Sequence, residues 1–148
     1  MMVIANASLD PSSVHAPPDA GIGVPTDYRP GACNIGPAEV ARRRRAVLVG
    51  VVASLALYLG LLAIAAPDAI RFVVAVPAAS AAISWLQVRE RFCVAFGLTG
   101  VFNFGPLGEL ESVADAEARR ADRRKVASMV ARGAGIAVLV GLLAVFVP

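Results

Sequence analysis

The feature that most constrains this chain is an uncharged run from Ala46 to Ala66, which is 21 residues long. At about 1.5 Å of rise per residue, a helix of this length covers roughly 30 Å, the hydrocarbon thickness of a bilayer. Four arginines, Arg42 to Arg45, precede the run, and Pro67-Asp68 follows it. The pattern predicts a membrane-spanning helix with a charged entry and a defined end.

Two further apolar runs follow in the sequence. Phe72 to Val88 is uncharged over 17 residues and lies between Arg71 and Arg89. This is close to the lower limit of about 17 residues for a span, and flanking arginines can extend it by reaching back to the headgroups. The third run extends from about Val126 to Pro148, with Arg132 near its entry. We therefore expect spans at about 46–66, 71–88 and 127–147.

The composition agrees with this assignment. The chain has 148 residues, of which 57% are hydrophobic and 17% charged, and its mean hydropathy is +0.69. A soluble domain of this size has too little interior to hide so much apolar sequence. The predicted fold class is all-α, an integral membrane bundle of three transmembrane helices.

The segment from Phe92 to Gly108 is also uncharged and is long enough to suggest a fourth span. A fourth span would place the basic cluster at 119–125 outside the cell, against the rule that basic loops stay in the cytoplasm. Its glycines, with Asn103 and Pro106, also make a poor membrane helix. We expect a cytoplasmic element, either interfacial or re-entrant, with the N-terminus of the chain in the cytoplasm and the C-terminus outside.

The predicted domain organisation is a tail followed by a membrane domain. Residues 1–36 are rich in Pro, Gly, Ser and Asp and show no periodic apolar face, so a mostly irregular cytoplasmic tail is expected. Its first residues lack the basic and apolar regions of a signal peptide. The membrane domain then covers 37–148, with a cytoplasmic loop and helix at 89–126.

The start of the first helix carries several helix-initiating signals. Gly36 is a plausible N-cap, Pro37 suits the first helical position, and Glu39 lies in the first turn, four residues before Arg43. The arginine run Arg42, Arg43, Arg44 and Arg45 has two compatible interpretations. It anchors the helix at the cytoplasmic surface, and it forms a contact site for anionic lipid headgroups.

Small residues recur at four-residue spacing in each predicted span. In lipid, the hydrophobic effect does not favour association of apolar helices, so van der Waals contact through close backbone approach becomes the main stabilising interaction between them. Alanine-rich sequences also contain such stripes by composition alone. A three-helix bundle and a homo-oligomer therefore both remain open. The stripes are Ala46, Gly50 and Ser54 in the first span, Ala75 with Ala79 and Ala78 with Ala82 in the second, and Gly133, Ala137 and Gly141 in the third.

Two cysteines are the only candidates for chemistry. Cys33 precedes the first helix and Cys93 follows the second, so both fall on the cytoplasmic side in this topology. Arg91 and the arginine run would favour a thiolate, which is the reactive form. A lone cysteine at a helix end is also a common packing residue. Whether the two thiols are adjacent stays open at this stage.

Other chemistry is not indicated. Two cysteines and one histidine, His15, are too few for a standard zinc site, so we expect no metal and no cofactor. The basic residues flank apolar runs, which favours membrane orientation over nucleic-acid binding. No catalytic residue is predicted.

Two segments together carry a family resemblance: CNIGPAEVARRRR (Cys33 to Arg45) and FCVAFGLTGVFNF (Phe92 to Phe104). With the terminal apolar helix, they resemble a group of small bacterial multi-pass membrane proteins to which no activity is assigned. The resemblance covers roughly residues 28 to 105. It implies three spans in a bacterial cytoplasmic membrane, carries over no catalytic residue, and favours a meeting of Cys33 and Cys93.

The leading functional hypothesis is a non-enzymatic accessory or scaffold protein of the bilayer. It would pack against a partner or itself, as a homo-oligomer or within a larger membrane complex. The alternative is a membrane-bound thiol or redox protein, or a small enzyme, that uses Cys33 and Cys93. A third hypothesis is a subunit of a transport complex.

Overall fold

The computed structural model describes residues 27–147 of the chain. Most of the predicted tail, including His15, lies outside the described residues. The described part begins with a short segment that turns at residues 30–32, where Arg29 and Cys33 form an antiparallel bridge, and then leads into the first long helix.

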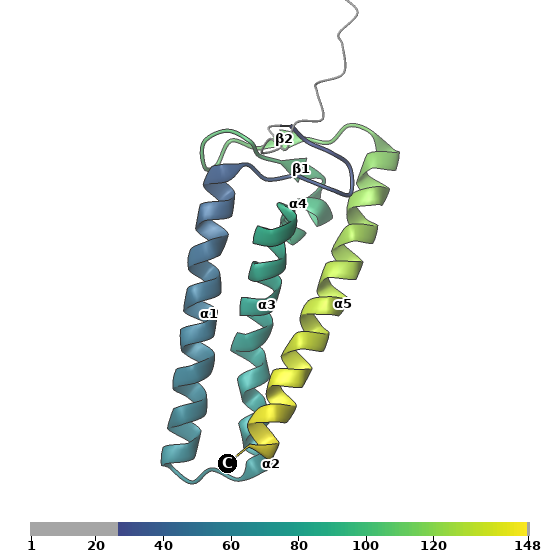
Figure 1. Cartoon of the computed structure of the whole chain (residues 1–148). Helices are drawn as coiled ribbons and strands as arrows, with labels where there is room; N and C mark the ends of the chain where they lie inside the picture. Colours follow the sequence, from purple (N-terminus) through teal and green to yellow (C-terminus); the bar gives the residue numbers. More distant parts are fainter. Residues whose placement is uncertain (1–26, 148) are drawn as a thin grey trace, which may run out of the picture.

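Three long helices lie side by side (Figure 1). They are α1 (Pro37–Ala63), α3 (Ala75–Glu90) and α5 (Ala116–Phe146). The short α2 (Asp68–Arg71) and a 3-10 turn, η1 (Phe72–Val74), lead into α3. By length and composition, Pro37–Ala63, Asp68–Glu90 and Ala116–Phe146 can each cross a membrane. The prediction of an all-α, multi-pass bundle is confirmed.

The signals at the start of α1 act as the sequence predicts. Gly36 is the N-cap and Pro37 is the first helical residue, where its missing N–H costs no intrahelical bond. Glu39 is buried in the first turn, and its carboxylate lies 3.0 Å from Arg42 and 3.7 Å from Arg43. The entry of α1 is therefore held by both capping and ion pairs.

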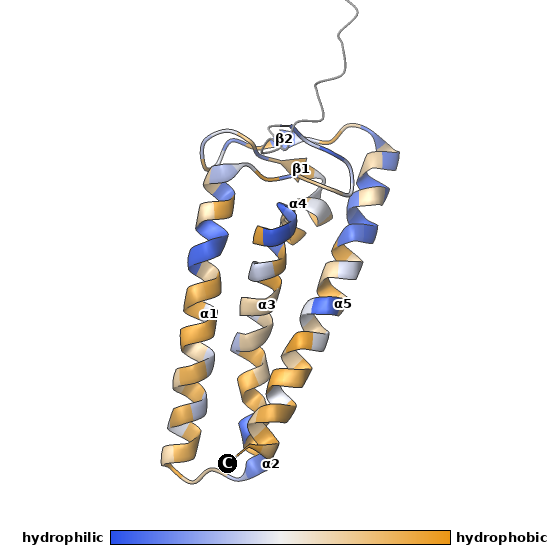
Figure 2. Cartoon of the chain, viewed as in Figure 1, coloured by the Kyte–Doolittle hydropathy of each residue, from blue (hydrophilic) through white to orange (hydrophobic). Residues whose placement is uncertain are grey.

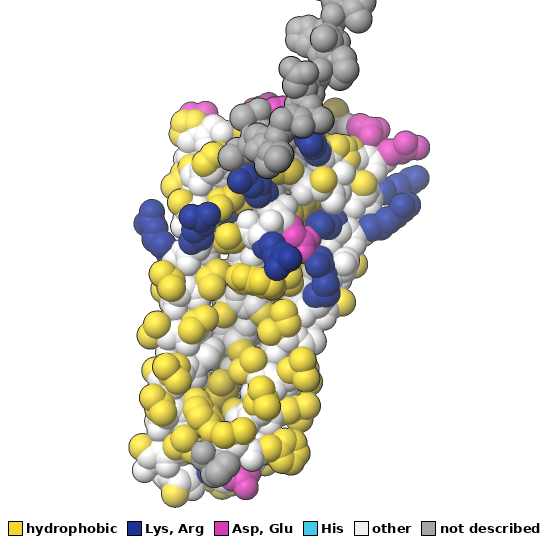
Figure 3. Space-filling view, viewed as in Figure 1, with side chains coloured by type: hydrophobic (Ala, Val, Ile, Leu, Met, Phe, Trp, Pro, Cys, Tyr) yellow, Lys and Arg dark blue, Asp and Glu magenta, His cyan; other side chains and the backbone are white. Residues whose placement is uncertain are grey.

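The two ends of the bundle differ in charge. Hydrophilic residues gather at the end where α1 and α5 begin, and apolar residues cover the rest of the helices (Figures 2 and 3). We call this end, with Arg42–Arg45, Arg89 and residues 119–125, the basic end. The opposite, far end carries Arg71, which is paired with Asp68 at 3.1 Å.

The basic end is covered by a layer of short elements, residues 27–36 and 91–115, which we call the end layer (Figure 1). It contains α4 (Val94–Thr99), which packs against α5, and β1 (Val101–Phe102), which pairs antiparallel with β2 (Glu111–Ser112). The uncharged segment at 92–108 thus forms a six-residue helix and a strand, which are too short to span a bilayer.

Candidate functional site

The small-residue stripes pack helices of the same chain against one another. Gly50 on α1 is buried against α3, where an added Cβ would lie 2.9 Å from the backbone nitrogen of Ala81. Ser54, one turn further along, is half-buried, and its hydroxyl donates to the Gly50 carbonyl at 2.7 Å. These contacts bring α1 and α3 to a separation that larger side chains would prevent.

The stripe on α5 faces α3 and the turn before it. A Cβ added at Gly133 would lie 2.6 Å from a side-chain carbon of Ile83, and one added at Gly141 would lie 2.8 Å from the ring of Phe72. Ala137, between them, is buried. All five predicted packing residues, Gly50, Ser54, Gly133, Ala137 and Gly141, therefore lie on inward-facing sides of the bundle.

Asn34 joins the two halves of the end layer. Its amide donates to the Cys93 carbonyl at 3.1 Å and accepts from the Cys93 N–H at 2.6 Å. The backbone continues the connection, because the N–H of Asn103 donates to the Asn34 carbonyl and the N–H of Gly36 donates to the Asn103 carbonyl at 2.7 Å. Asn34 and Asn103 are both buried, and their bonds tie the segment before α1 to the segment after α3.

Gly36 has a steric reason to be glycine in addition to its capping role. A Cβ at this position would lie 2.8 Å from the Cα of Phe104. The backbone of residues 34–36 therefore approaches the backbone of residues 103–104 more closely than any side chain would permit.

Asp122 connects the N-terminal segment to α5. It is fully buried and accepts from the Tyr28 hydroxyl at 2.8 Å and from the Gly31 N–H at 2.7 Å. The Tyr28 ring stacks on Phe102 with centroids 4.9 Å apart. Burial and the bond to Asp122 raise the pKa of Tyr28 above its ordinary value. The segment before α1 is thus fixed both to α5, through Asp122, and to β1, through Phe102.

Neither Asn34 nor Asp122 was selected from the sequence as a site residue. Asp122 belongs to a charged stretch that suggests a solvated helix, yet it falls in register with Ala118 and Val126 on the buried side of α5. The four-residue spacing of Asp122 from Ala118 and Val126 is the sequence pattern that could have identified it as an inward-facing carboxylate. Asn34 has no comparable signal, since it precedes the first helix in a loop.

The two cysteines lie in joined segments but have different partners. Both are buried and neither forms a disulfide. The Cys93 sulfur lies 2.9 Å from a guanidinium nitrogen of Arg43, which donates to it. The Cys33 thiol faces the Ile35 carbonyl at 3.9 Å, and burial raises the pKa of that thiol. Of the two, Cys93 is the one whose sulfur has a cationic partner.

The four arginines of the run divide into two pairs. Arg42 and Arg43 pair with Glu39, as described above, and Arg43 also contacts Cys93. Arg44 and Arg45 are exposed, and within residues 27–147 they form no ion pair. They are the members of the run that remain open to lipid headgroups.

A second charged cluster joins α3 to α5 at the basic end. The Glu90 carboxylate lies 2.5 Å from Lys125 and 2.7 Å from Arg132. Beside it, the guanidinium carbon of Arg89 lies 5.4 Å from the centre of the Trp85 ring, within range of a cation–π interaction. This cluster carries more positive than negative charge.

Within residues 27–147, no group of three or more His, Cys, Asp and Glu side chains is arranged to hold a metal ion. The described residues therefore offer buried hydrogen bonds between segments, close contacts at small residues and charged clusters. Comparison of the chain with protein-family models, with curated proteins and with solved structures finds no match.

Proposed function

We propose that this protein is a non-enzymatic membrane scaffold or accessory protein that presents its end layer to a partner. The observation that carries the proposal is the use of buried polar side chains in that layer and in the first turns of the helices that support it. Asn34, Glu39 and Asp122 are buried, and each binds other residues of the same chain. Such internal bonding stabilises a pre-formed surface on top of three membrane helices, which lowers the entropic cost of binding.

The outermost loop of the end layer offers a contact surface. Residues 105–112 are exposed, and within this loop Leu107 and Leu110 are 54% and 55% exposed. Apolar side chains that are held in the open on a rigid surface are typical of docking sites. We infer that this loop is the part of the layer that meets a partner or a second copy of the chain.

The proposed orientation places the basic end in the cytoplasm and the C-terminus outside. Its support is the distribution of basic residues, which are concentrated at one end of the bundle, whereas the far end has Arg71 paired with Asp68. The resemblance to small bacterial multi-pass proteins adds a bacterial cytoplasmic membrane to this proposal. A reporter fused after Pro148 should be active only outside the cytoplasm, and strong cytoplasmic activity would contradict the orientation.

Site-specific photocrosslinking tests the docking surface. A photoreactive residue at Leu110 should give one discrete protein adduct in native membranes, and Leu107→Ser should remove most of it. The matched control is Leu59 on α1, which is 54% exposed and lies within the apolar part of the helix, so it should react with lipid. An adduct of twice the protomer mass identifies self-association. Absence of a protein adduct from the photoreactive residue at Leu110 would refute the proposal.

A second candidate function rests on the contact between Arg43 and Cys93. The guanidinium nitrogen 2.9 Å from the sulfur can stabilise negative charge that develops on it during a reaction, so Cys93 is the residue that a membrane thiol protein would use. In this version Cys33 has a packing role, because its pKa is raised and its partner is a carbonyl group.

Alkylation kinetics distinguish this candidate from the first. In a Cys33→Ser background, Arg43→Gln should slow maleimide labelling of Cys93 about tenfold, and Arg43→Lys should restore much of the rate. Cys93 is fully buried, so labelling also reports whether the thiol becomes accessible in native membranes. Complete resistance of Cys93 to labelling in all three backgrounds would exclude a thiol function.

A further inference from the structure

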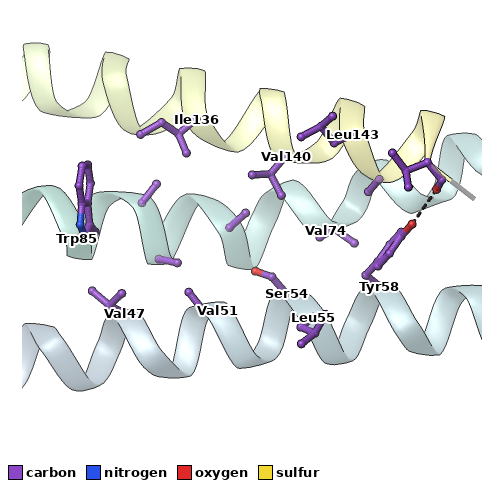
Figure 4. Close-up of a pocket in the computed structure, with 15 residues that line it drawn as sticks. Val47, Val51, Ser54, Leu55, Tyr58, Val74, Trp85, Ile136, Val140 and Leu143 are labelled. Carbon is purple, nitrogen blue, oxygen red and sulfur yellow. Dashed lines mark hydrogen bonds between the residues drawn. The ribbon is translucent and has the colours of Figure 1, made fainter.

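The side of the bundle between α1 and α5 is open. Both helices pack on α3, and between them lies a groove of about 670 Å³ whose floor is α3 (Figure 4). The floor is made of small side chains, among them Ala78, Ala81 and Ala82. Small residues on α3 let α1 approach closely, and the same residues leave space between the two outer helices.

The walls of the groove are apolar. Two hydroxyl groups lie along it, and both are already hydrogen-bonded within the chain. Ser54 donates to the Gly50 carbonyl, and Tyr58 donates to the Val147 carbonyl at 2.7 Å. The Tyr58 bond crosses from α1 to the end of α5 and bounds the groove there, as Figure 4 shows. Apart from the Trp85 indole N–H near the basic end, the lining is apolar or already uses its hydroxyl donors, so the groove favours hydrocarbon.

The length of the groove matches one leaflet. Its lining on α1 extends from Val47 to Tyr58, which is about 16 Å at 1.5 Å per residue. That is about half the 30 Å hydrocarbon thickness of a bilayer. A transmembrane helix from another protein needs the full thickness, whereas an acyl chain that enters from the basic end needs one leaflet.

The basic end of the groove carries the complementary charge for a phospholipid headgroup. Trp85 and Ile136 line both this groove and an adjoining hollow of about 470 Å³, which is also lined by Arg89, Glu90 and Arg132. Glu90 is shared between Lys125 and Arg132, and within residues 27–147 Arg89 has no carboxylate partner. The three cations and one anion leave a local excess of two positive charges.

We propose that the groove between α1 and α5 binds one acyl chain of an anionic phospholipid, whose headgroup phosphate lies at Arg89 and Arg132. This site differs from the arginine run at the start of α1, because it combines a fitted apolar channel with the charge. It is also independent of any partner at the end layer, so either proposal can fail alone.

Trp85 provides a direct reporter, since it is the only tryptophan in the chain and lines both hollows. The full-length protein is reconstituted in phosphatidylcholine vesicles that contain a small, equal fraction of chain-brominated lipid. Brominated phosphatidylglycerol should quench Trp85 fluorescence with about fivefold higher apparent affinity than brominated phosphatidylcholine, since one basic side chain contributes roughly that factor toward anionic lipid. Equal quenching by the two lipids would overturn the proposal.

Matched variants separate the headgroup from the chain. Arg89→Gln should reduce the preference for phosphatidylglycerol to about twofold or less, and Arg123→Gln, the same change of charge at an exposed position outside both hollows, should leave it intact. Val51→Phe fills the groove and should lower quenching by both lipids, whereas Val52→Phe, on the neighbouring exposed position, should not. Retention of the preference in Arg89→Gln, or equal effects of the two valine variants, would refute the site.

The same samples test the competing occupant. If a second copy of the chain fills the groove, brominated lipids will quench Trp85 weakly regardless of headgroup, and a crosslinker at Val51 will give a dimer. That combination would overturn lipid binding, whereas lipid adducts at Val51 would support it.

Discussion

In the end layer and the first turns of the helices beneath it, the buried polar side chains Asn34, Glu39 and Asp122 bind residues of the same chain by hydrogen bonds and ion pairs. Along the membrane helices, the closest contacts are made at small residues, as at Gly50, Ala137 and Gly141, and the larger buried side chains Leu86 and Met129 cluster with Phe92 next to the end layer. The first region is held by directional polar contacts, and the second by close approach of backbones.

The difference follows from the surroundings of each region. Lipid tails are as apolar as leucine, so burying a larger apolar side chain between helices brings little advantage over leaving it in lipid. Close packing of small residues then supplies the van der Waals contact. Outside the hydrocarbon, water competes for every polar group, so the end layer gains order from hydrogen bonds that are buried.

The largest effect is expected from removal of the buried carboxylate that ties the end layer to α5. Asp122→Ala should lower the free energy of unfolding by about 3 kcal/mol, because the Gly31 N–H and the Tyr28 hydroxyl both lose their acceptor. The control Glu117→Ala, at an exposed position on the same helix, should change it by less than about 0.5 kcal/mol. Denaturant unfolding in detergent measures the stability of the two variants. Equal losses for Asp122→Ala and Glu117→Ala would contradict a stabilising role for the Asp122 hydrogen bonds.

The corresponding test in the membrane helices uses two glycines of α1. Gly50→Ala should destabilise the bundle by about 2 kcal/mol, since its Cβ would meet backbone atoms of Ala81 that cannot move aside. Gly60 has no atom within 4 Å of an added Cβ, so Gly60→Ala should be neutral or stabilise by up to about 1 kcal/mol. Thermal unfolding of the two variants should shift in opposite directions or by clearly different amounts.

A polar contact within the membrane region should matter less than one in the end layer. Tyr58→Phe removes the hydroxyl that bonds the Val147 carbonyl and should cost about 0.6 kcal/mol, the typical value for hydrogen bonds between membrane helices. A loss as large as that of Asp122→Ala would show that the two regions are held by the same kind of contact.

The smallest effect is expected at alkaline pH. The pKa of Tyr28 is raised in the folded state by burial and by Asp122, so the folded state retains a proton that the unfolded state loses above about pH 10. The stability that Tyr28 contributes is fully present below that pH and declines as the pH rises toward the folded-state pKa. The difference in Tm between wild type and Tyr28→Phe should therefore be constant up to about pH 10 and shrink above it. A constant difference throughout would contradict the burial of the phenol.

Much of the fold follows from local sequence. The uncharged run after Arg45, the Gly36-Pro37 start and the charge pattern around residues 119–125 suffice for three spans and for a fourth segment that does not cross. These features act over one or two helical turns, or through transfer into lipid, which depends on each residue separately. The small-residue stripes also mark the inward sides of α1 and α5, because close packing in lipid requires them.

The sequence by itself determined the helical fold class, the start of α1 and the three segments that are apolar enough to span a membrane. The tertiary structure alone decided which residues meet across the chain. Asn34 meets Cys93 over 59 residues and Asp122 meets Tyr28 over 94, and the groove exists only because α1 and α5 lie on opposite sides of the small-residue floor of α3. Sequence periodicity describes one helix at a time, whereas a hydrogen bond between distant segments or a groove depends on how several helices and loops are placed relative to one another.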